Sequence, residues 1–380
     1  MKRILIVTEL YVPGFKGGGP IKTIKNIVDS FEKKYDFLIL TSDRDLGDSI
    51  SYPNIIPNRI ISNRSHKILY TSPKKQNLFF FKKYLENEYD AIYINSFFSK
   101  FTILILLLVK LRLLKSKKVI VAPRGELASS ALKFKKNKKY IYLKLSDFFG
   151  LYNKVFFQAT SKEELKSINK MINLKGKKTY LVSNLAGVSN DNNSSAKLKD
   201  HLSIIYISRI HPIKNLLFII EILSELTNLN ISLDIYGPIE DKKYYEECEK
   251  KIHKLPANIV VNYKGSLEQT KVQKTISNYN LFFLPTLGEN FGHTIVEALL
   301  TLTPVLISDQ TPWNEVSNLG AGKAISLKDK ESFIDYIKYL SSMDQLEFNL
   351  IKQNIEKFVT KHIQDDKETE KYEEMFESNS

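Results

Sequence analysis

Short runs of apolar residues recur along the chain, and most are followed by a polar loop and a longer amphipathic stretch. The short runs predict buried strands, and stretches whose apolar residues return every three or four positions predict helices. In the first half, strands are predicted at residues 3–8, 37–41, 67–71, 91–95, 118–122, 155–159 and 179–182. Helices are predicted at residues 21–31, 77–88 and 98–114, and Ser161 and Glu164 fit a capping box that starts another. Residues 43–67, with two prolines, predict a long irregular connection.

The second half repeats the alternation. Strands are predicted at residues 202–207, 231–236, 259–263, 281–285 and 303–308, and helices at 215–227, 244–254, 267–278, 293–300, 330–340, 345–361 and 367–377. Strands that alternate with helices on both sides of a polar linker (residues 189–200) predict two doubly wound α/β domains. We expect these domains at residues 1–185 and 186–360, with ligands in the cleft between them. Residues 361–380 are expected to form a helical tail that packs back on the first domain.

The composition and charge of the chain limit the classes of function that it can have. The 380 residues are 43% hydrophobic, which is ordinary for a globular chain of two domains. The longest apolar run, residues 101–109, falls well short of the ~20 residues of a spanning helix, so a cytoplasmic location is expected. The net charge of +14 favours an acidic partner. A single cysteine, Cys248, excludes an intrachain disulfide and a Cys-based zinc cluster.

Residues 281–308 (LFFLPTLGENFGHTIVEALLTLTPVLIS) read as strand, loop, helix and strand, which is one unit of a parallel sheet. The loop with Glu289, Asn290 and Gly292 is expected at the carboxyl end of its strand, where the following helix N-terminus suits an anion. Glu289 and Glu297 admit three interpretations: a glycosidase-like pair of carboxylates, an ordinary first-turn helix residue for Glu297, or acceptors for sugar hydroxyls. The spacing alone does not decide among them.

Two further loops carry candidate chemistry. Arg209 and Lys214 (SRIHPIK) follow a predicted strand, where two cations could clamp a diphosphate or could be solvated surface residues; position alone weighs these equally. Glycines at residues 14–19 allow close approach of the backbone to a ligand, but the P-loop spacing is missing and a flexible turn is the favoured interpretation. Trp313 could stack on a base or a sugar, although a lone loop tryptophan more often packs.

The stretch from Lys133 to Lys144 (KFKKNKKYIYLK) interleaves basic and aromatic residues. It could bind nucleic acid, form a solvated helix face, or contact an anionic membrane. Because the α/β pattern contains no recognisable nucleic-acid-binding motif, an anionic membrane surface or an anionic acceptor is favoured and nucleic acid is not expected.

Together these features resemble the retaining glycosyltransferases of family 4, which have the GT-B architecture of two facing Rossmann-like domains. The resemblance rests on an E-x7-E motif from Glu289 to Glu297, continued by Ala298-Leu299 and Thr303-Pro304-Val305. Ser208-Arg209 with Lys214, the glycine-rich loop and residues 161–164 support it in the family's order over nearly the whole chain.

The resemblance implies a nucleoside-diphosphate sugar as donor substrate, bound by the second domain, and an acceptor on the first. It implies no metal or other cofactor. Arg209 and Lys214 would hold the diphosphate and, with Glu289 facing the transferred sugar, would form the catalytic set. The other implied donor contacts are Glu297 on the ribose, the backbone of Asn290, Phe291 and Gly292, and Gly18 and Gly19 from the first domain.

One departure from the family concerns the loop after residues 118–122. Many members have a His-Gly pair there, whereas this chain has Pro123-Arg124-Gly125-Glu126. Arg124 cannot act as a base at neutral pH, but it could bind phosphate or sugar oxygens, and Glu126 could orient the acceptor. His293 is a further candidate near the donor, with a helix-start residue as an equally weighted alternative.

The expected activity is transfer of a hexose or N-acetylhexosamine to a glycan or lipid-linked glycan, in assembly of a surface polysaccharide such as capsule or lipopolysaccharide. The enzyme would work in the cytoplasm, peripherally on the inner face of the membrane. A transferase with a small soluble acceptor, of the sugar-phosphate synthase type, is the alternative among enzymes. A non-catalytic basic binding protein is the alternative outside them.

Overall fold

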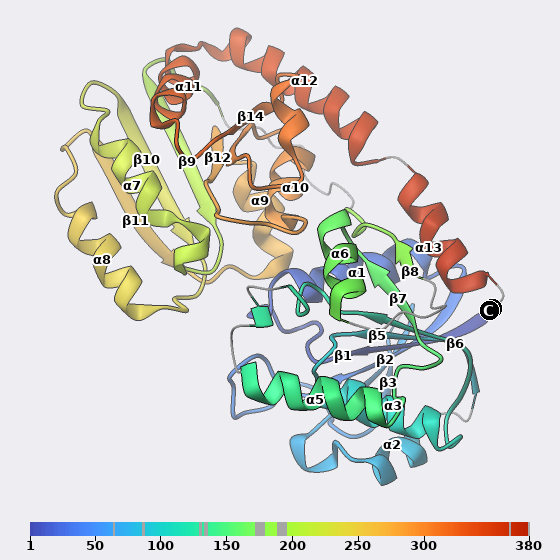
Figure 1. Cartoon of the computed structure of the whole chain (residues 1–380). Helices are drawn as coiled ribbons and strands as arrows, with labels where there is room; N and C mark the ends of the chain where they lie inside the picture. Colours follow the sequence, from blue (N-terminus) through green and yellow to red (C-terminus); the bar gives the residue numbers. More distant parts are fainter. Residues whose placement is uncertain are drawn as a thin grey trace. The chain divides into compact units, whose positions relative to one another are not determined.

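The computed structural model describes the chain except residues 64, 86–87, 129–130, 133–135, 172–178, 188–195, 365 and 379–380. Two compact units emerge (Figure 1). Unit 1 comprises Met1–Leu185 together with Asp366–Ser380, and unit 2 comprises Ala186–Asp365. The last helix, α13 (Lys367–Glu377), therefore belongs to the unit that contains the N-terminus.

Unit 1 is built on an 8-stranded sheet with the order β3-β4-β2-β1-β5-β6-β7-β8. The pairings are parallel except that of β3 with β4. The strands are β1 (Lys2–Thr8), β2 (Tyr35–Ser42), β3 (Ile60–Ser62), β4 (Lys67–Thr71), β5 (Glu88–Asn95), β6 (Lys115–Ala122), β7 (Phe156–Ala159) and β8 (Thr179–Leu181). This order places the chain start, β1, near the middle of the sheet.

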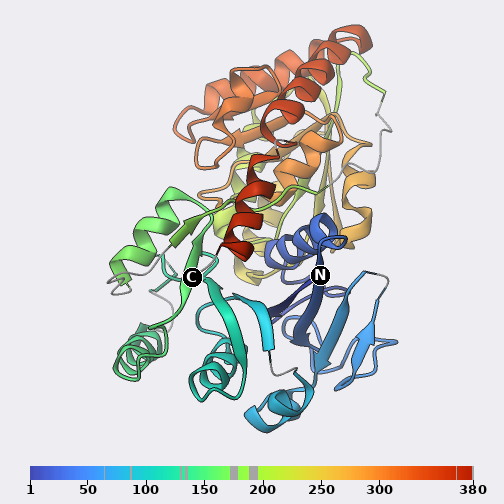
Figure 2. The ribbon, with the colours of Figure 1, turned by 90° about the vertical axis from the view of Figure 1, so that its right-hand side faces the viewer.

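Both faces of this sheet are buried, and successive residues of β1 alternate between two hydrophobic clusters. Ile4 and Ile6 belong to one cluster, with α1 (Gly19–Phe31) and α13, whereas Leu5 and Val7 belong to the other. Figure 2 shows α1, in blue, and α13, in red, over the same face. The second cluster includes residues of α2 (Leu78–Tyr84), α3 (Lys100–Lys110) and α5 (Lys136–Phe148). Continuous apolar strands are what a sheet covered on both faces requires.

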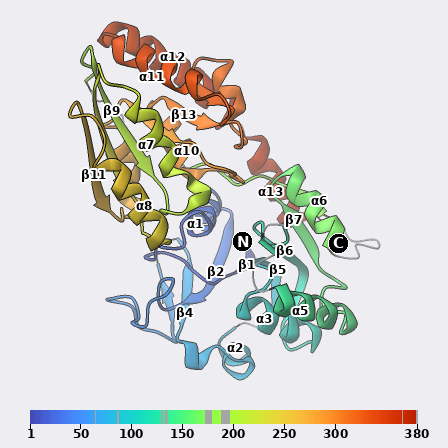
Figure 3. The same ribbon diagram turned by 60° about the vertical axis from the view of Figure 1, so that its left-hand side comes forward.

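Unit 2 contains a 6-stranded parallel sheet with the order β11-β10-β9-β12-β13-β14 (Figure 3). The strands are β9 (His201–Ile207), β10 (Asn230–Tyr236), β11 (Ile259–Gly265), β12 (Leu281–Leu284), β13 (Val305–Ser308) and β14 (Gly322–Ile325). Helix α7 (Leu216–Ser224) contacts α8 (Lys242–Ile252) and α11 (Lys330–Ser342), while α10 (His293–Leu300) contacts α9 (Val272–Ile276) and α12 (Gln345–His362). The unit is therefore also doubly wound.

The expected fold class, two doubly wound α/β domains, is confirmed, and most of the predicted elements are present. The differences concern lengths, two short strands, and helix α5 (Lys136–Phe148), which was not among the predicted helices. The expected helix at 77–88 ends at Tyr84, and the one at 267–278 is a 3-10 turn (Gln269–Lys271) followed by the short α9. Strand β3 lies within the connection expected to be irregular, and β14 was not predicted, because each is only three or four residues long.

The capping box at Ser161 is only half formed. Glu164 N donates to Ser161 Oγ at 3.1 Å and starts α6 (Lys162–Met171), as predicted. The carboxylate of Glu164 instead accepts from Thr160 N (2.8 Å) and from Gly125 N (2.6 Å). It therefore ties the helix start to the loop after β6. Residues 133–135 of the basic run and 189–195 of the expected linker lie outside the described residues.

Lys118 anchors the C-terminal segment within unit 1. It lies on β6, is 3% exposed, and donates from Nζ to Met375 O (3.1 Å), Tyr180 Oη (3.1 Å) and Ser378 Oγ (2.7 Å). The ammonium group also lies 5.3 Å from the ring centroid of Phe156. Its hydrogen bonds and ring contact compensate the lost hydration of this buried cation.

We expect Lys118→Met to loosen α13, because it leaves the carbonyl of Met375 without its buried donor. Loss of such a bond costs about 2 kcal/mol, so amide hydrogen exchange in α13 should be roughly 30-fold faster. Lys117→Met is the matched control, since Lys117 is an exposed neighbour that pairs with Asp90. Equal exchange in the two variants would contradict the anchoring role.

Candidate active site

The sheet of unit 2 has a topological switch point between β9 and β12. The chain runs from β9 outward through β10 to β11, and then returns to the other side of β9 as β12. The loops that follow these two strands therefore diverge from neighbouring positions at the carboxyl edge of the sheet. Ligands of doubly wound sheets bind at such an edge.

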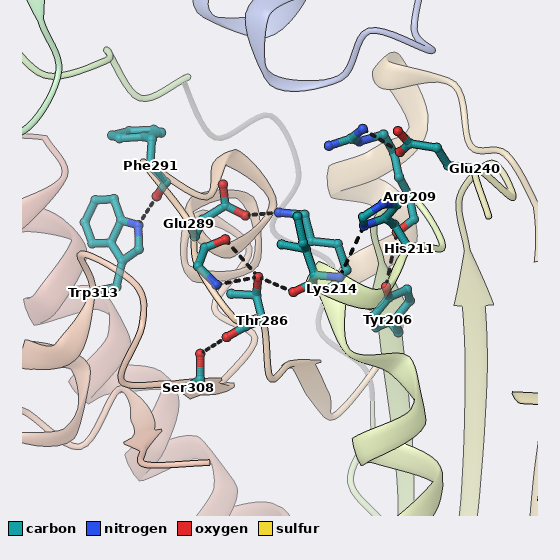
Figure 4. A network of polar contacts seen from close by, with 12 residues as sticks. Tyr206, Arg209, His211, Lys214, Glu240, Thr286, Glu289, Phe291, Ser308 and Trp313 are labelled. Carbon is teal, nitrogen blue, oxygen red and sulfur yellow. Dashed lines mark hydrogen bonds and ion pairs between the residues drawn. The ribbon is translucent and has the colours of Figure 1, made fainter. Parts of the chain in front are cut away.

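Hydrogen bonds join the two loops to each other (Figure 4). Thr286, just beyond β12, donates from Oγ1 to the carbonyl of Ile213 at 3.0 Å, and Leu287 N donates to the same carbonyl at 2.8 Å. Asn215, in the left-handed conformation with φ 58°, donates from Nδ2 to Pro285 O at 3.1 Å. The loop after β9 and the loop after β12 thus form one connected structure.

Lys214 and Glu289 meet across these loops. Lys214 Nζ lies 2.5 Å from Glu289 Oε2, and the two side chains are only 12% and 20% exposed. The Glu289 backbone N–H is fixed by Gln310 O at 3.0 Å. The structure therefore brings together two of the three residues that the resemblance makes catalytic, as a partly desolvated ion pair at the switch point.

Arg209, the third, faces another partner. Its guanidinium lies 2.5 Å from Glu240 Oε2, with side chains 48% and 44% exposed (Figure 4). An exposed pair of this kind contributes about 0–1 kcal/mol. Little free energy would therefore be lost if Arg209 released Glu240 and bound a phosphate oxygen instead.

The loop containing Asn290, Phe291 and Gly292 leads directly into α10. Gly292 is the N-cap residue, with φ 76°. A Cβ at this position would lie 2.8 Å from Ile295 Cδ1 and 3.1 Å from Glu289 Cγ, so only glycine fits without displacing the Glu289 side chain. Trp313 Nε1 donates to Phe291 O, and the His293 ring lies 4.7 Å from that of Phe291. These contacts fix the backbone at the helix N-terminus.

Glu297 lies in the second turn of α10 and is 2% exposed, so the alternative of an ordinary first-turn residue is wrong. Its Oε1 accepts a hydrogen bond from Gln269 Nε2 at 2.9 Å. The ribose role stays a prediction.

In unit 1, the glycine-rich loop follows β1 and ends at α1. Gly18 has φ 61°, and a Cβ there would meet nothing within 4 Å, so the space on that side of its backbone is open. Gly19 is the first residue of α1. The loop is held from the other side, since Asp45 Oδ2 accepts from Phe15 N (2.8 Å) and Lys16 N (3.1 Å). The donor contacts assigned to the two glycines remain predictions.

Arg124 and Glu126 are both engaged within unit 1. Arg124 has φ 54° and donates to Asn95 Oδ1 (2.7 Å), Asn184 Oδ1 (2.6 Å) and Tyr93 Oη (2.6 Å). Glu126 accepts from Ser96 Oγ at 2.8 Å, and from the backbone N–H groups of residues 97 and 98 at 2.7 and 3.0 Å. The Glu126 carboxylate thus holds the loop after β5 in place. The sequence did not indicate this contact.

Sequence reasoning also missed Thr286 and Gln269, and it left the role of Trp313 open. Thr286 directly follows a strand end, a position that could have marked it. Nothing in the sequence near Gln269 pairs it with Glu297, because the two are 28 residues apart. A separate hollow of about 820 Å³, lined by Ser326, Tyr336 and Tyr339 among others, lies beside the edge strand β14 and shares no residue with the loops described above.

Comparison with known proteins finds a family match in the second half of the chain. Residues 188–357 match the model of the family "Glycosyl transferases group 1", a range that includes Arg209, Lys214, Glu289 and Glu297. An uncharacterised 41.2 kDa protein in the cps region of Klebsiella pneumoniae is 22% identical over 261 residues, covering 66% of this chain and 68% of that protein.

Solved structures share the fold of the whole chain. HepE of Anabaena, in complex with UDP and glucose, gives a TM-score of 0.65 at 13% identity, with 96% of each chain covered. The trehalose-6-phosphate synthase OtsA gives 0.69 at 9% identity, with 99% of each covered. The whole chain therefore has the GT-B fold of these structures, and residues 188–357, which make up most of unit 2, match the group 1 glycosyltransferase family.

We expect Gly292→Ala to destabilise unit 2 by about 1–3 kcal/mol, because alanine must adopt a left-handed backbone and displace Glu289 or Ile295. Urea unfolding monitored by Trp313 fluorescence measures this. Gly288→Ala is the matched control in the same loop, since a Cβ there meets nothing within 4 Å and Gly288 needs no positive φ. A Gly292→Ala variant as stable as the control would contradict the packing described above.

Proposed function

We propose that the enzyme transfers a hexose or N-acetylhexosamine from a nucleoside-diphosphate sugar to a glycan or lipid-linked glycan, with retention of configuration. The observation that carries this proposal is the Lys214–Glu289 contact beside the N-terminus of α10, at the switch point of a group 1 domain. The complex of HepE with UDP and glucose supports a nucleotide-sugar donor. The similarity to a protein in a cps region supports a place in surface polysaccharide assembly.

The proposed chemistry follows from charge. When the sugar leaves, negative charge develops on the diphosphate, and fixed positive groups at that position lower the barrier. Lys214 has three donors and can bind phosphate while it still contacts Glu289. The first backbone N–H groups of α10 have no partner within the helix and favour an anion. Arg209 joins them once phosphate replaces Glu240.

The two glutamates take different parts in this proposal. Glu289, held by its own backbone and by Lys214, accepts hydrogen bonds from hydroxyls of the transferred sugar. Glu297, buried beneath the helix surface, accepts them from the ribose. Lys214, Arg209 and α10 supply the positive charge, so we propose that no metal is needed. Among the described residues, no three His, Cys, Asp or Glu side chains converge as metal ligands.

We expect Lys214→Gln and Glu297→Gln each to lower the rate of nucleoside-diphosphate release about 10²–10³-fold, because each removes a group that contacts the donor. Release is measured by a coupled assay over a panel of nucleotide sugars, and the product anomer by NMR. Lys251→Gln is the matched control, an exposed cation of the same unit paired with Glu221. Wild-type turnover by both variants would refute the site assignment, and an inverted product would refute retention.

We also propose that α5 binds an anionic membrane surface. Among the side chains that the structure describes on this helix, Ile141, Leu145 and Phe148 are 57%, 50% and 82% exposed. Their i, i+4, i+7 spacing places them on one helix face. Lys138 and Lys144 are exposed beside them, while Leu143 packs on the core from the opposite face. No described helix is long and apolar enough to cross a bilayer, so contact would be with the surface.

We expect the protein to float with vesicles that contain anionic lipid, and the Leu145→Ser/Phe148→Ser variant to float at least tenfold less. Partial burial of two such side chains is worth about 2–4 kcal/mol. Lys138→Gln/Lys144→Gln should bind with less dependence on salt, at about 1 kcal/mol per lysine. Leu346→Ser, which replaces a 76% exposed leucine on α12, is the control. Equal flotation of all variants would refute this surface.

The similarity to OtsA keeps a soluble acceptor as the second candidate. The two functions differ in one observable outcome. If the protein does not bind vesicles and transfers sugar to a soluble sugar phosphate, the sugar-phosphate synthase type is favoured.

A further inference from the structure

The sheet of unit 1 has its own topological switch point, between β1 and β5. From β1 the chain passes to β2 and on to β4, and it then returns to the other side of β1 as β5. Thr8 is paired with Asn95 at the end of these strands, so Glu9 and Ser96 are the first residues beyond the sheet on either side of the opening. By the same rule that locates Lys214 and Glu289 in unit 2, a ligand of unit 1 binds here.

The backbone around this opening is strained. Ser96 has φ 122° and Arg124 has φ 54°, conformations that side-chain-bearing residues seldom adopt. Glu126 holds the Ser96 loop with three hydrogen bonds, and Arg124 is fixed by two asparagines and a tyrosine. Such strain gathers at functional sites, where surrounding contacts maintain it.

Two polar groups at the opening have no partner among the residues that the structure describes. Asn95 is 5% exposed, and its Nδ2 makes no hydrogen bond to any residue that the structure describes. Its orientation is set by Oδ1, which accepts from both Nε and NH2 of Arg124. The Glu9 side chain is exposed, and within the described part of the chain its carboxylate makes no hydrogen bond or ion pair. Asn95 Nδ2 is enclosed by the protein, so the exposed group that can accept a hydrogen bond from a ligand hydroxyl is the Glu9 carboxylate.

The electrostatic surroundings favour proton uptake by Glu9. Although the residue as a whole is exposed, desolvation of its carboxylate by the surrounding protein raises the pKa of Glu9 above its ordinary value, and the negative charge of Glu126 raises it further. The other charged side chains that follow neighbouring strands are paired elsewhere: Arg44 contacts Asp43 after β2, Asp45 caps the glycine-rich loop, and Arg124 contacts neutral groups. A raised pKa makes a carboxylate a stronger base.

We propose that Glu9 is the residue that binds the attacking hydroxyl of the acceptor and receives its proton. This inference rests on the proposed function. As the acceptor oxygen bonds to the anomeric carbon, the bond from that carbon to the diphosphate oxygen breaks, and its electron pair leaves with the diphosphate. The hydroxyl proton passes to the Glu9 carboxylate. The acceptor is thus recognised as an alcohol through Glu9, not through Glu126, whose oxygens are already occupied.

Glu9→Gln tests this role, because glutamine keeps the size and removes the base. Since the carboxylate has no partner to lose, the variant should fold as the wild type does. We expect transfer to the acceptor to fall about 10²–10³-fold in kcat/KM, while the thermal shift given by the nucleotide sugar stays unchanged. Glu9→Asp should recover part of the rate. Glu88→Gln, at the opposite end of β5 and also exposed, is the matched control.

The pH profile separates a base from a structural residue. The base must be deprotonated, so wild-type kcat/KM should rise with pH through a limb above the ordinary glutamic acid pKa, and Glu9→Gln should lose that limb. Wild-type transfer by Glu9→Gln, or an unchanged limb, overturns the role of Glu9 while leaving the donor site intact. A wild-type protein that neither binds nor turns over any nucleotide sugar instead refutes the proposed function.

Discussion

Burial of a parallel sheet on both faces is the constraint on which both units depend. Helices must cover both faces of each sheet. The chain therefore adds strands outward from a central strand on one side, and it later adds the remaining strands on the other side. Because the chain changes sides in this way, the loops that follow two adjacent central strands lead away in opposite directions. The polar loops at both switch points follow from this requirement: Lys214 and Glu289 in unit 2, and Glu9 with the loop after β5 in unit 1.

The two switch points differ in charge and in how they are held. In unit 2 a cation and a carboxylate form an ion pair, and a hydrogen bond from Thr286 joins their two loops. In unit 1 carboxylates dominate the opening, and the nearby cation, Arg124, is bound to neutral partners. The two openings therefore differ in the charge that they present to a ligand.

Much of the fold could be predicted from the sequence, because long apolar runs and helical periodicity are local signals. The strands of both sheets were found this way except β3 and β14, which are too short to show a period. Lys214 and Glu289 were identified by their motif, but their contact joins residues 75 apart and is visible only in three dimensions. The partners of Arg209 and Glu126 could not be predicted for the same reason. Glu9 carries no motif at all; it gains importance only from the strand order.

The position of α13 has a consequence for synthesis. Tyr372, Met375 and Phe376 complete the hydrophobic cluster on the α1 face of unit 1, yet they are made after all of unit 2. A ribosome releases the chain from its N-terminus, and domains generally fold as they emerge. Unit 1 must therefore wait with one face of its sheet partly bare, while unit 2 has its entire sequence available as soon as α12 leaves the ribosome. Unit 1 is thus the later of the two units to reach its native state, and loss of α13 would damage the unit that was translated first.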